Sequence, residues 1–389
     1  MTNHNSDTSA RPLRIGLVGT GGIAAIHADN VARLDGRAQI VAATDIDAGR
    51  LTAFCTKWQI ENSYTTLDEL LEATDATEPL DIVHLCSPPG LHKEQAIAIL
   101  LRGINVLSEK PPALSLEELD EIAAAEVVGG ASFATVSQHR FGGRAVWLRE
   151  VVREGSFGRL LTGVCNTLWF RPDAYFEVPW RGKWGVEGGG PTMGHGIHQI
   201  DTMLSLVGAW SEVVAVASRL ARDVQTEDVS HAIVTLENGA VISVVNSLLS
   251  PRETSYLRFD FEYATVELEH LYGYGDDNWR VTAAPGYEHV VGEIVARGPH
   301  GQGSGHAAQF EVIADALAAG QPLPVDTASA RGTLELIAGI YASAFTGVRV
   351  HPGDIGEDSP FYASMEGSGA PWAGTSASAS ALASASVNA

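Results

Sequence analysis

The sequence is poor in cysteine, and its cysteines stand far apart. Only three of the 389 residues are cysteine, namely Cys55, Cys86 and Cys165. They form no CxxC pair, so the pattern is typical of buried thiols in a reducing compartment.

Long apolar runs are also missing. No stretch approaches the ~18 apolar residues that a membrane-spanning helix needs. The first residues, MTNHNSDTSARP, are polar and lack the apolar centre of a secretory signal. We therefore expect a cytoplasmic protein.

Basic residues are few compared with acidic ones. Lysine and arginine number 25 against 47 aspartates and glutamates, which gives a formal net charge of −22. A surface this acidic repels phosphate backbones and anionic lipids, so we expect neither nucleic acid nor a membrane as a partner. The length is sufficient for two domains, each with its own core.

The two ends of the chain differ from the rest in composition. Residues 1–12 are polar, and residues 363–389 turn into glycine, serine and alanine. Such segments have too little apolar area to offset the entropy lost on ordering, so both are expected to be disordered.

Residues 13–138 alternate between strand and helix patterns. Short, continuous apolar runs such as RIGLV, QIVAAT, DIVHLC and NVLSE are typical of strands buried on both faces. Ser115 begins an intervening helix, with Glu118 three residues later as in a capping box. This alternation predicts an α/β Rossmann domain with a parallel, doubly wound sheet.

Residues 139–362 follow a different rhythm, with strand patterns following one another directly. Asn238-Gly239 lies between two of them and predicts a hairpin. We expect a second, α+β domain for substrate binding and oligomerisation, with a large, mostly antiparallel sheet. One open face of that sheet would be covered by another subunit in a homodimer or homotetramer.

A dinucleotide fingerprint follows the first strand. Gly19, Gly21 and Ala24 give GxGxxG/A, and Gly22 and Ile23 open the helix whose N–H groups would face the pyrophosphate. The next strand ends at Asp45, where a carboxylate can bind the ribose hydroxyls and repel a 2′-phosphate. No arginine follows immediately, so NAD is favoured over NADP.

Two further loops leave the carboxyl ends of predicted strands, where ligands bind in open α/β sheets. One carries Ser87, Pro88 and His92, and the other carries Glu109 and Lys110 before two prolines. These residues, together with Gln138 at the end of the domain, complete the expected cofactor site.

The order of these motifs resembles the Gfo/Idh/MocA oxidoreductase family, whose members include relatives of glucose–fructose oxidoreductase and inositol dehydrogenase. The resemblance rests on the fingerprint, SPPGLH, EKP, WRGKW followed by EGGGPTMGHGIHQID, and a GTLELIAGIYASAFTG segment near the end. It covers roughly residues 13–362.

The resemblance implies roles for individual residues. Lys110 matches the EKP lysine, which contacts substrate and nicotinamide and takes part in proton transfer, and His198 matches the usual acid/base. Gly194 stands where many members carry an aspartate, which is a departure from the family's catalytic triad. The expected substrate is a sugar or cyclitol.

The residues around His198 also predict a helix, since Ile197, Ile200, Leu204 and Val207 recur at helical spacing. His195 would lie on the same helix, one turn from His198 and on the same face. His195 and Asp201 are the candidate partners of the His198 ring in place of the missing aspartate.

Other side chains in this region are further candidates. Trp184 is a candidate substrate contact, because sugar rings present apolar faces to aromatic side chains. Arg181, in the same WRGKW motif, is a second candidate. A zinc site built from the two histidines and Glu187 has no further ligand cluster beside it, so we expect no metal.

Three functions are compatible with this pattern. The first is an NAD-dependent dehydrogenase acting on a secondary hydroxyl of a sugar or polyol. The second is a redox-assisted lyase or glycoside-cleaving enzyme that retains its NAD, and Gly194 keeps that possibility open. The third is a non-catalytic NAD-binding regulator, against which the presence of both Lys110 and His198 argues.

Overall fold

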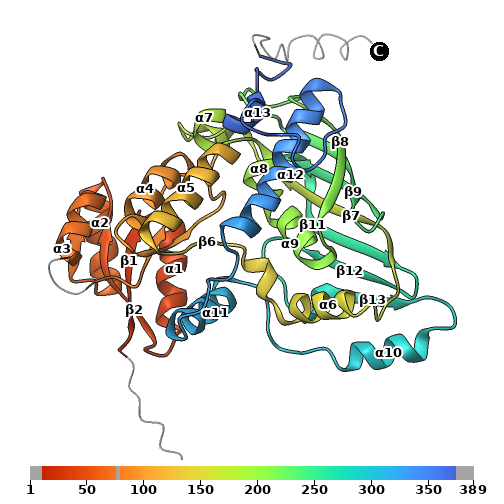
Figure 1. Ribbon diagram of the computed structural model, residues 1–389, viewed down its shortest axis with the longest axis horizontal. Coiled ribbons are helices and arrows are strands. Elements are labelled where there is room, and N and C mark those ends of the chain that lie inside the picture. Colours follow the sequence, from red (N-terminus) through yellow and green to blue (C-terminus); the bar gives the residue numbers. More distant parts are fainter. Residues whose placement is uncertain (1–10, 76–78, 374–389) are drawn as a thin grey trace, which may run out of the picture.

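Two β-sheets with helices between and around them form the protein (Figure 1). The computed structural model describes residues 11–75 and 79–373. The segments expected to be disordered, residues 1–12 and 363–389, therefore lie largely outside the described residues.

The first sheet is parallel and has six strands in the order β3-β2-β1-β4-β5-β6. This is the doubly wound order that the alternating pattern predicts, and it reverses between β1 and β4. The elements are β1 Leu13–Val18, α1 Gly22–Ala32, β2 Ala38–Thr44, α2 Ala48–Trp58, β3 Asn62–Tyr64, α3 Leu67–Asp75, β4 Ile82–Leu85, α4 His92–Leu100, β5 Asn105–Ser108, α5 Leu116–Gly129 and β6 Phe133–Thr135.

Local sequence explains these elements. β1 ends in four consecutive buried residues, and all four residues of β4 are buried, as continuous apolar runs require. Ser115 caps α5 by accepting a hydrogen bond from the backbone N–H of Glu118. The side chain of Glu118 accepts from the N–H of Leu114.

The Rossmann domain is not continuous in sequence, although we expected residues 13–138 to form it alone. Helix α11 (His306–Ala318) returns from the second domain and packs on α1. Its Phe310 and Ile313 belong to the same buried cluster as Ile15 and Leu17 of β1. No local pattern marks this return, because an apolar helix face does not specify which sheet it will cover.

The second sheet has seven strands in the order β13-β12-β11-β7-β10-β9-β8. All neighbours are antiparallel except the central pair β7 and β10. The strands are β7 Leu160–Phe170, β8 Trp210–Ser218, β9 Val229–Leu236, β10 Val241–Ser247, β11 Leu249–Phe261, β12 Ala264–His270 and β13 Trp279–Ala283.

The expected hairpin joins β9 and β10. Gly239 has a positive φ of 86°, whereas Asn238 is not in the left-handed region. Its side chain instead accepts a hydrogen bond from the N–H of Ala240. One glycine, and not two left-handed residues, is enough to make this turn.

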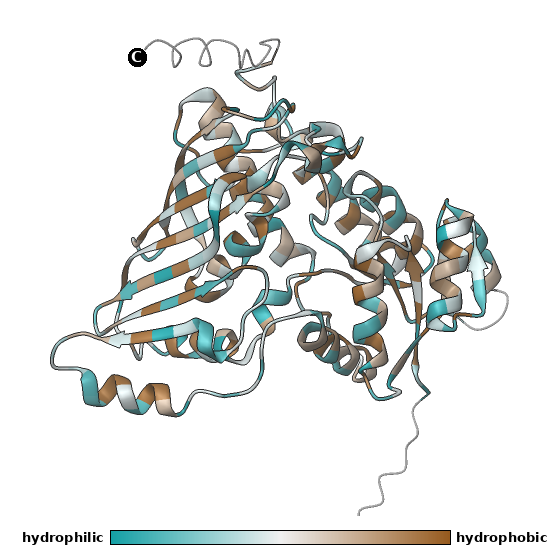
Figure 2. Ribbon diagram, turned by 180° about the vertical axis from the view of Figure 1, so that it is seen from behind, coloured by the Kyte–Doolittle hydropathy of each residue, from teal (hydrophilic) through white to brown (hydrophobic). Residues whose placement is uncertain are grey.

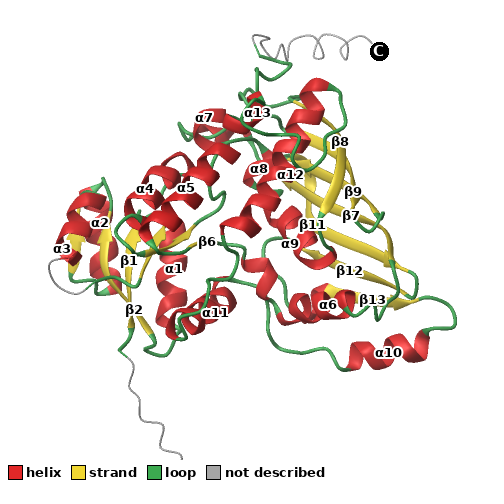
Figure 3. Ribbon diagram, viewed as in Figure 1, coloured by secondary structure: helices red, strands yellow, loops and turns green. Residues whose placement is uncertain are grey.

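The helices of the second domain lie beside this sheet, and several of them separate it from the Rossmann domain (Figure 3). They are α6 Gly143–Arg153, α7 Trp184–Glu187, α8 Pro191–Gly194, α9 Ile197–Val207, α10 Glu288–Ala296, α12 Thr327–Thr346 and α13 Pro360–Ala363. The long helix α12 packs on β8, and α9 packs on β7.

The other face of the sheet carries exposed apolar side chains. Val214, Val216, Ile233 and Val241 are each at least 40% exposed, while their neighbours along the strands are buried. Hydrophobic and hydrophilic residues alternate along these strands in Figure 2. This open face agrees with the expected open-faced sheet. Among the described helices, none is both long and apolar enough to cross a membrane.

The packed C-terminal part extends beyond the expected boundary at residue 362. Met365 and Ala370 are buried in the core, and Trp372 packs on Phe345 with ring centroids 5.4 Å apart. A few apolar residues among glycines are enough to anchor this segment, which composition alone did not indicate.

Candidate active site

The turn between β1 and α1 forms a glycine-lined cradle. Gly19 has a φ of 84°, and a Cβ there would lie 2.8 Å from the carbonyl oxygen of Cys86. In contrast, a Cβ on Gly21 or Gly22 would meet no atom within 4 Å. No side chain caps the N-terminus of α1, so its N–H groups face this open space. Ile23 is half-buried in the first helical turn. The cradle fits the pyrophosphate of a dinucleotide.

Asp45 lies beside this cradle at the end of β2. Its Oδ2 accepts hydrogen bonds from the N–H and the hydroxyl of Thr20, both at 2.8 Å. Arg50 of α2 binds the same carboxylate at 2.7 and 3.0 Å. Burial opposes ionisation, but these donors hold the pKa of Asp45 well below its usual range. Asp45 is therefore ionised, with Arg50 as an immediate neighbour.

His92 joins the two loops that follow β4 and β5. Its Nδ1 lies 2.8 Å from the carbonyl oxygen of Pro111, and its Nε2 lies 2.9 Å from that of Ser87. The side chain is fully buried. We expected His92 to bind the cofactor, but the structure engages both ring nitrogens in holding the loops together. Ser87 and Pro88 keep their expected place at the switch point of the sheet.

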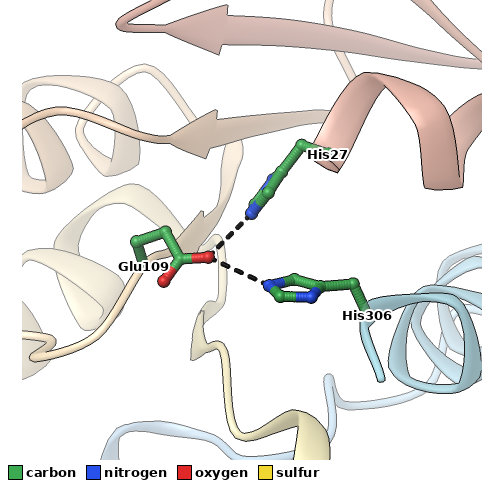
Figure 4. A group of neighbouring side chains, drawn as sticks. All are labelled: His27, Glu109 and His306. Atoms are coloured by element: carbon green, nitrogen blue, oxygen red, sulfur yellow. Dashed lines mark hydrogen bonds and ion pairs between the residues drawn. The ribbon is translucent and has the colours of Figure 1, made fainter. Parts of the chain in front are cut away.

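Glu109 points into the interior of the Rossmann domain, where two histidines meet it (Figure 4). Its Oε1 lies 3.0 Å from Nε2 of His27 in α1 and 3.2 Å from Nε2 of His306 in α11. The other ring nitrogen of His27 lies 3.0 Å from Nδ1 of His84. Burial alone would raise the pKa of Glu109, but the hydrogen bonds from the two histidines hold it well below its usual range.

We expected Glu109 to contact the cofactor, but its carboxylate instead binds His27 and His306 in the interior of the domain. The ligand atoms of Glu109, His27 and His306 lie within 4.8 Å of one another, a spacing at which a metal could be held. The distances from Oε1 of Glu109 to the two histidine nitrogens, 3.0 and 3.2 Å, are those of direct hydrogen bonds. These hydrogen bonds satisfy the carboxylate oxygen without a metal ion. The other oxygen, Oε2, accepts from the N–H of Lys110 at 3.2 Å. Glu109 therefore fixes the backbone that carries Lys110.

Lys110 reaches from the Rossmann domain to the second domain. Its Nζ donates a hydrogen bond to the carbonyl oxygen of Gly194 at 3.0 Å. Burial lowers the pKa of Lys110, the Glu109 carboxylate opposes this, and the cation of Arg181 lowers it further. The side chain is thus placed as a proton donor of reduced pKa between the two domains.

Gly188, Gly189 and Gly190 pack tightly, but against the protein itself. A Cβ on Gly190 would lie 2.1 Å from the carbonyl oxygen of Glu227. The Glu227 side chain accepts hydrogen bonds from the N–H groups of Gly190 and Thr192, both at 3.0 Å, and from the hydroxyl of Tyr341 at 2.8 Å. Burial raises the pKa of Glu227 to about 7. This clamp fixes the segment that leads to the two histidines.

His195 and His198 do not share one helix, contrary to our expectation. Helix α8 ends at Gly194, and α9 begins only at Ile197. The break occurs at Gly196, where a Cβ would lie 2.2 Å from the side-chain oxygen of Asn246. His195 instead contacts Trp169, with ring centroids 5.0 Å apart. Close packing on β10 thus overrides the helical periodicity.

His198 is a buried imidazole with a free nitrogen. Its Nε2 has no hydrogen-bond partner within the described residues. The ring is held between His139 and Tyr272, with centroid distances of 5.2 and 5.8 Å. Burial lowers the pKa of His198 well below its usual value, and the Lys110 cation lowers it further. The ring is therefore neutral at pH 7 and can accept a proton.

Lys110 and His198 line one cavity at the boundary of the two domains. The rest of its wall comes from the loop after β5, from β6 and the turn that follows it, and from the N-terminal parts of α9 and α12. The residues are Pro112, Thr135, Val136, Ser137, His139, Ile197, Asp201, Ala330 and Thr333. A proton donor and a proton acceptor thus face the same space.

Asp201 lines this cavity but does not support His198. Its two oxygens accept from Arg140 at 2.5 and 2.8 Å, and Thr333 donates a further hydrogen bond at 3.1 Å. A carboxylate held in a buried ion pair with all of these donors is part of the framework. The alternative partner, His195, makes its ring contacts with Trp169 and Tyr175.

The remaining expected residues differ in their placement. Trp184 is a core residue whose Nε1 donates to the carbonyl oxygen of Gln225, so it is not a substrate contact. Arg181 lies over the ring of Tyr175 and pairs with Glu187. Gln138 is buried, and its amide reaches the hydroxyl of Tyr272 at 3.4 Å.

Several side chains that shape this site were missed from the sequence. Arg50 follows Asp45 by five residues, one turn into a predicted helix, and that spacing could have found it. Arg140, Glu227 and His306 gave no local signal, because each meets its partner across 37 to 197 residues of sequence.

Comparisons with known proteins agree with this geometry. Residues 13–134 match the GFO/IDH/MocA model described as an oxidoreductase family with an NAD-binding Rossmann fold, and residues 146–267 match the GFO/IDH/MocA C-terminal domain. D-glucoside 3-dehydrogenase from Escherichia coli is 25% identical over 89% of this chain and 99% of its own length. Myo-inositol 2-dehydrogenase from Thermotoga maritima is 31% identical over 38% of this chain and 42% of its own length.

A solved structure extends the likeness to three dimensions. The WlbA dehydrogenase from Bordetella pertussis, in complex with NADH and UDP-GlcNAcA, superposes with a TM-score of 0.77 at 27% identity. The match covers 88% of this chain and 99% of that chain. The chain described here belongs to the GFO/IDH/MocA family of NAD-binding oxidoreductases.

Proposed function

We propose that the protein is an NAD-dependent dehydrogenase that oxidises a secondary hydroxyl of a sugar or cyclitol. The observation that carries this proposal is the cavity lined by both Lys110 and His198, whose buried Nε2 has no hydrogen-bond partner within the described residues. The names of the Escherichia coli and Thermotoga maritima relatives, a glucoside and an inositol dehydrogenase, support the substrate class.

The cavity residues divide the chemistry between them. The glycine cradle before α1 would hold NAD, which would supply the acceptor for the hydride of the carbinol carbon. His198 takes the hydroxyl proton on Nε2, and Lys110 donates a hydrogen bond to the same oxygen while its negative charge develops. The C–H and O–H bonds break, the C=O bond forms, and the two electrons leave with the hydride.

One observation keeps a second reaction open. Gly194 provides no carboxylate to orient His198 or to store its proton, so a redox-assisted elimination with retained NAD is the alternative. A non-catalytic NAD-binding regulator is less consistent with a lysine and a histidine that line one cavity at the boundary of the two domains, since a binding module does not need this pair.

The open face of the second sheet supports a homo-oligomer. Val216 is 65% exposed and Ile233 51%, and a second subunit would remove these side chains from water. A homodimer or homotetramer thus remains our proposal, as does a cytoplasmic location.

The proposed reaction is tested by net formation of NADH. Purified protein and NAD are assayed against cyclitols, aldoses and glycosides, and absorbance at the NADH band is read. We expect turnover with at least one of them. Lys110→Ala should abolish turnover but leave NADH binding measurable by fluorescence, because Lys110 stabilises the transition state more than the bound dinucleotide.

The matched control is Lys93→Ala, which removes a surface lysine paired with Glu121 at 3.2 Å. Product formed without net NADH would support the alternative reaction instead. A Lys110→Ala enzyme with near-normal kcat would remove this lysine from the mechanism.

The two histidines should contribute unequally. His198→Ala should lose roughly 10²–10⁴-fold in kcat, as for removal of a general base, whereas His195→Ala should lose less. Because burial and Lys110 lower the pKa of His198, the acidic limb of the wild-type kcat/KM profile should lie below pH ~6.5. A nearly silent His198→Ala beside a severe His195→Ala would reverse these assignments.

Position 194 can be tested because it faces open space. A Cβ on Gly194 would meet no atom within 4 Å, so Gly194→Asp should fold normally. Its carboxylate would favour the protonated forms of Lys110 and His198, so the acidic limb should move up by about one pH unit or more. Gly194→Asn is the uncharged control. Equal profiles for the two variants would show that position 194 lies too far from the titrating groups to matter.

Cofactor preference should follow Asp45. We expect a higher kcat/KM for NAD than for NADP in the wild type. Asp45→Ala should reduce this ratio at least about tenfold, because it removes ribose hydrogen bonds and leaves Arg50 available to a 2′-phosphate. Asp29→Ala removes a carboxylate from the outer part of α1 and serves as the control. Similar use of both dinucleotides by the wild type would contradict the preference.

A further inference from the structure

Two arginines flank the proposed active site in a protein whose net charge is −22. Arg171 follows the end of β7, and Arg181 precedes α7. Both act electrostatically on the site: together with Lys110, they lower the pKa of His195 beyond the effect of burial. Three cations, each with a carboxylate nearby, thus act on one region of a chain that is acidic overall.

Aromatic rings hold these arginines in place next to His195. The guanidinium carbon of Arg181 lies 3.9 Å from the ring centroid of Tyr175 and 4.3 Å from that of Trp180. That of Arg171 lies 4.7 Å from the centroid of Trp169. Trp169 and Tyr175 are the rings that contact His195, at centroid distances of 5.0 and 6.2 Å.

The hydrogen bonds of Arg181 leave part of its guanidinium free. Its Nη1 donates to the Tyr175 hydroxyl and, at 3.3 Å, to Oε1 of Glu187. Within the described residues its Nε and Nη2 have no hydrogen-bond partner, and the side chain is 24% exposed. Glu187 also accepts from the N–H of Gly182, and burial raises its pKa.

Arg171 is held in a similar way. Its Nη1 donates to the carbonyl oxygen of Phe170 at 2.8 Å and to Glu253 at 3.0 Å, and the guanidinium also reaches the Tyr175 hydroxyl. The side chain is 21% exposed. Both guanidiniums are therefore held by stacking on aromatic rings and by hydrogen bonds that Nη1 donates. Each side chain is still partly exposed to solvent.

We propose that the substrate carries an anionic group, a carboxylate or a phosphate, which Arg181 binds with Arg171 as a second positive charge. A planar guanidinium with a free edge matches such a group, and stacking on Tyr175 and Trp180 orients it before the ligand arrives. The inference rests on the proposed function: it narrows the substrate class to acidic sugars or cyclitols.

A neutral polyol would not need this arrangement. In the ligand-free state Glu253 pairs with Arg171 and Glu187 pairs with Arg181, and an anionic group would add a further partner at the remaining N–H groups of Arg181. Such a contact places the selectivity in affinity more than in the chemical step.

The experiment compares glucose, glucuronate and glucose 6-phosphate as matched neutral, carboxylate and phosphate probes. Binding to the NADH-loaded protein is measured by calorimetry, and oxidation is measured with NAD. For at least one anion we expect binding roughly 10- to 100-fold tighter than for glucose, and weaker binding as salt is raised. The carboxylate and phosphate arms identify which group is recognised.

Arg181→Gln should remove this preference for the anion, and Arg181→Lys should restore only part of it, because lysine keeps the charge but not the fork. Arg159→Gln is the control: Arg159 pairs with Glu262 on the surface and is 80% exposed. Near-UV circular dichroism of each variant reports whether the aromatic cluster is intact.

The outcomes separate this inference from the proposed function. Neutral sugars oxidised in preference to both anions would overturn the inference and leave the dehydrogenase standing. Anion binding that depends on Arg181 without oxidation of any probe would support the inference and count against the reaction. Equal binding of all three probes, no anion binding, or an anion preference that survives Arg181→Gln would also overturn it.

Discussion

The partial burial of the Lys110 side chain between two domains is the constraint on which the site depends. Removing such a cation from water is costly unless polar groups receive it. The structure supplies the carbonyl oxygen of Gly194 on one side and the Glu109 carboxylate on the other. Because Gly194 belongs to the second domain, the same interaction also fixes how the two domains meet at the cavity.

Much of the polar interior serves to hold backbone in place for that lysine and for His198. Glu109, with His27 and His306, ties the turn that carries Lys110 to α1 and α11. Glu227 clamps the segment before His195 through two N–H groups, and the Arg140–Asp201 pair anchors α9. Each group is buried and fully engaged, so the cavity wall need not reorganise when a charge develops in it.

The sequence was sufficient to predict the features that depend on neighbours along the chain. The glycine turn, the Asp45 strand end and the Lys110 loop each lie within a few residues of their strand, and the structure has them at the carboxyl ends of β1, β2 and β5 in the parallel sheet. The break at Gly196 and the return of α11 depend on Asn246 and on the core of another domain. Periodicity carries no information about such distant partners, which is why His195 was wrongly assigned to the helix of His198.

The absence of a carboxylate at position 194 changes what His198 can do. A carboxylate partner would raise the pKa of the imidazole and stabilise its protonated form. Here His139 and Tyr272 orient the ring through their edges and faces, and burial favours the neutral form.

His198 is consequently neutral at pH 7 but weakly basic. In the reaction that we propose, proton abstraction by this ring therefore needs a group that stabilises the oxygen losing the proton. Lys110 is the cation in the same cavity that can provide this, and its own lowered pKa makes its hydrogen bond to a developing oxyanion stronger. The two residues are therefore coupled in the proposed reaction: the strong hydrogen bond from Lys110 to the substrate oxygen compensates for the low basicity of His198.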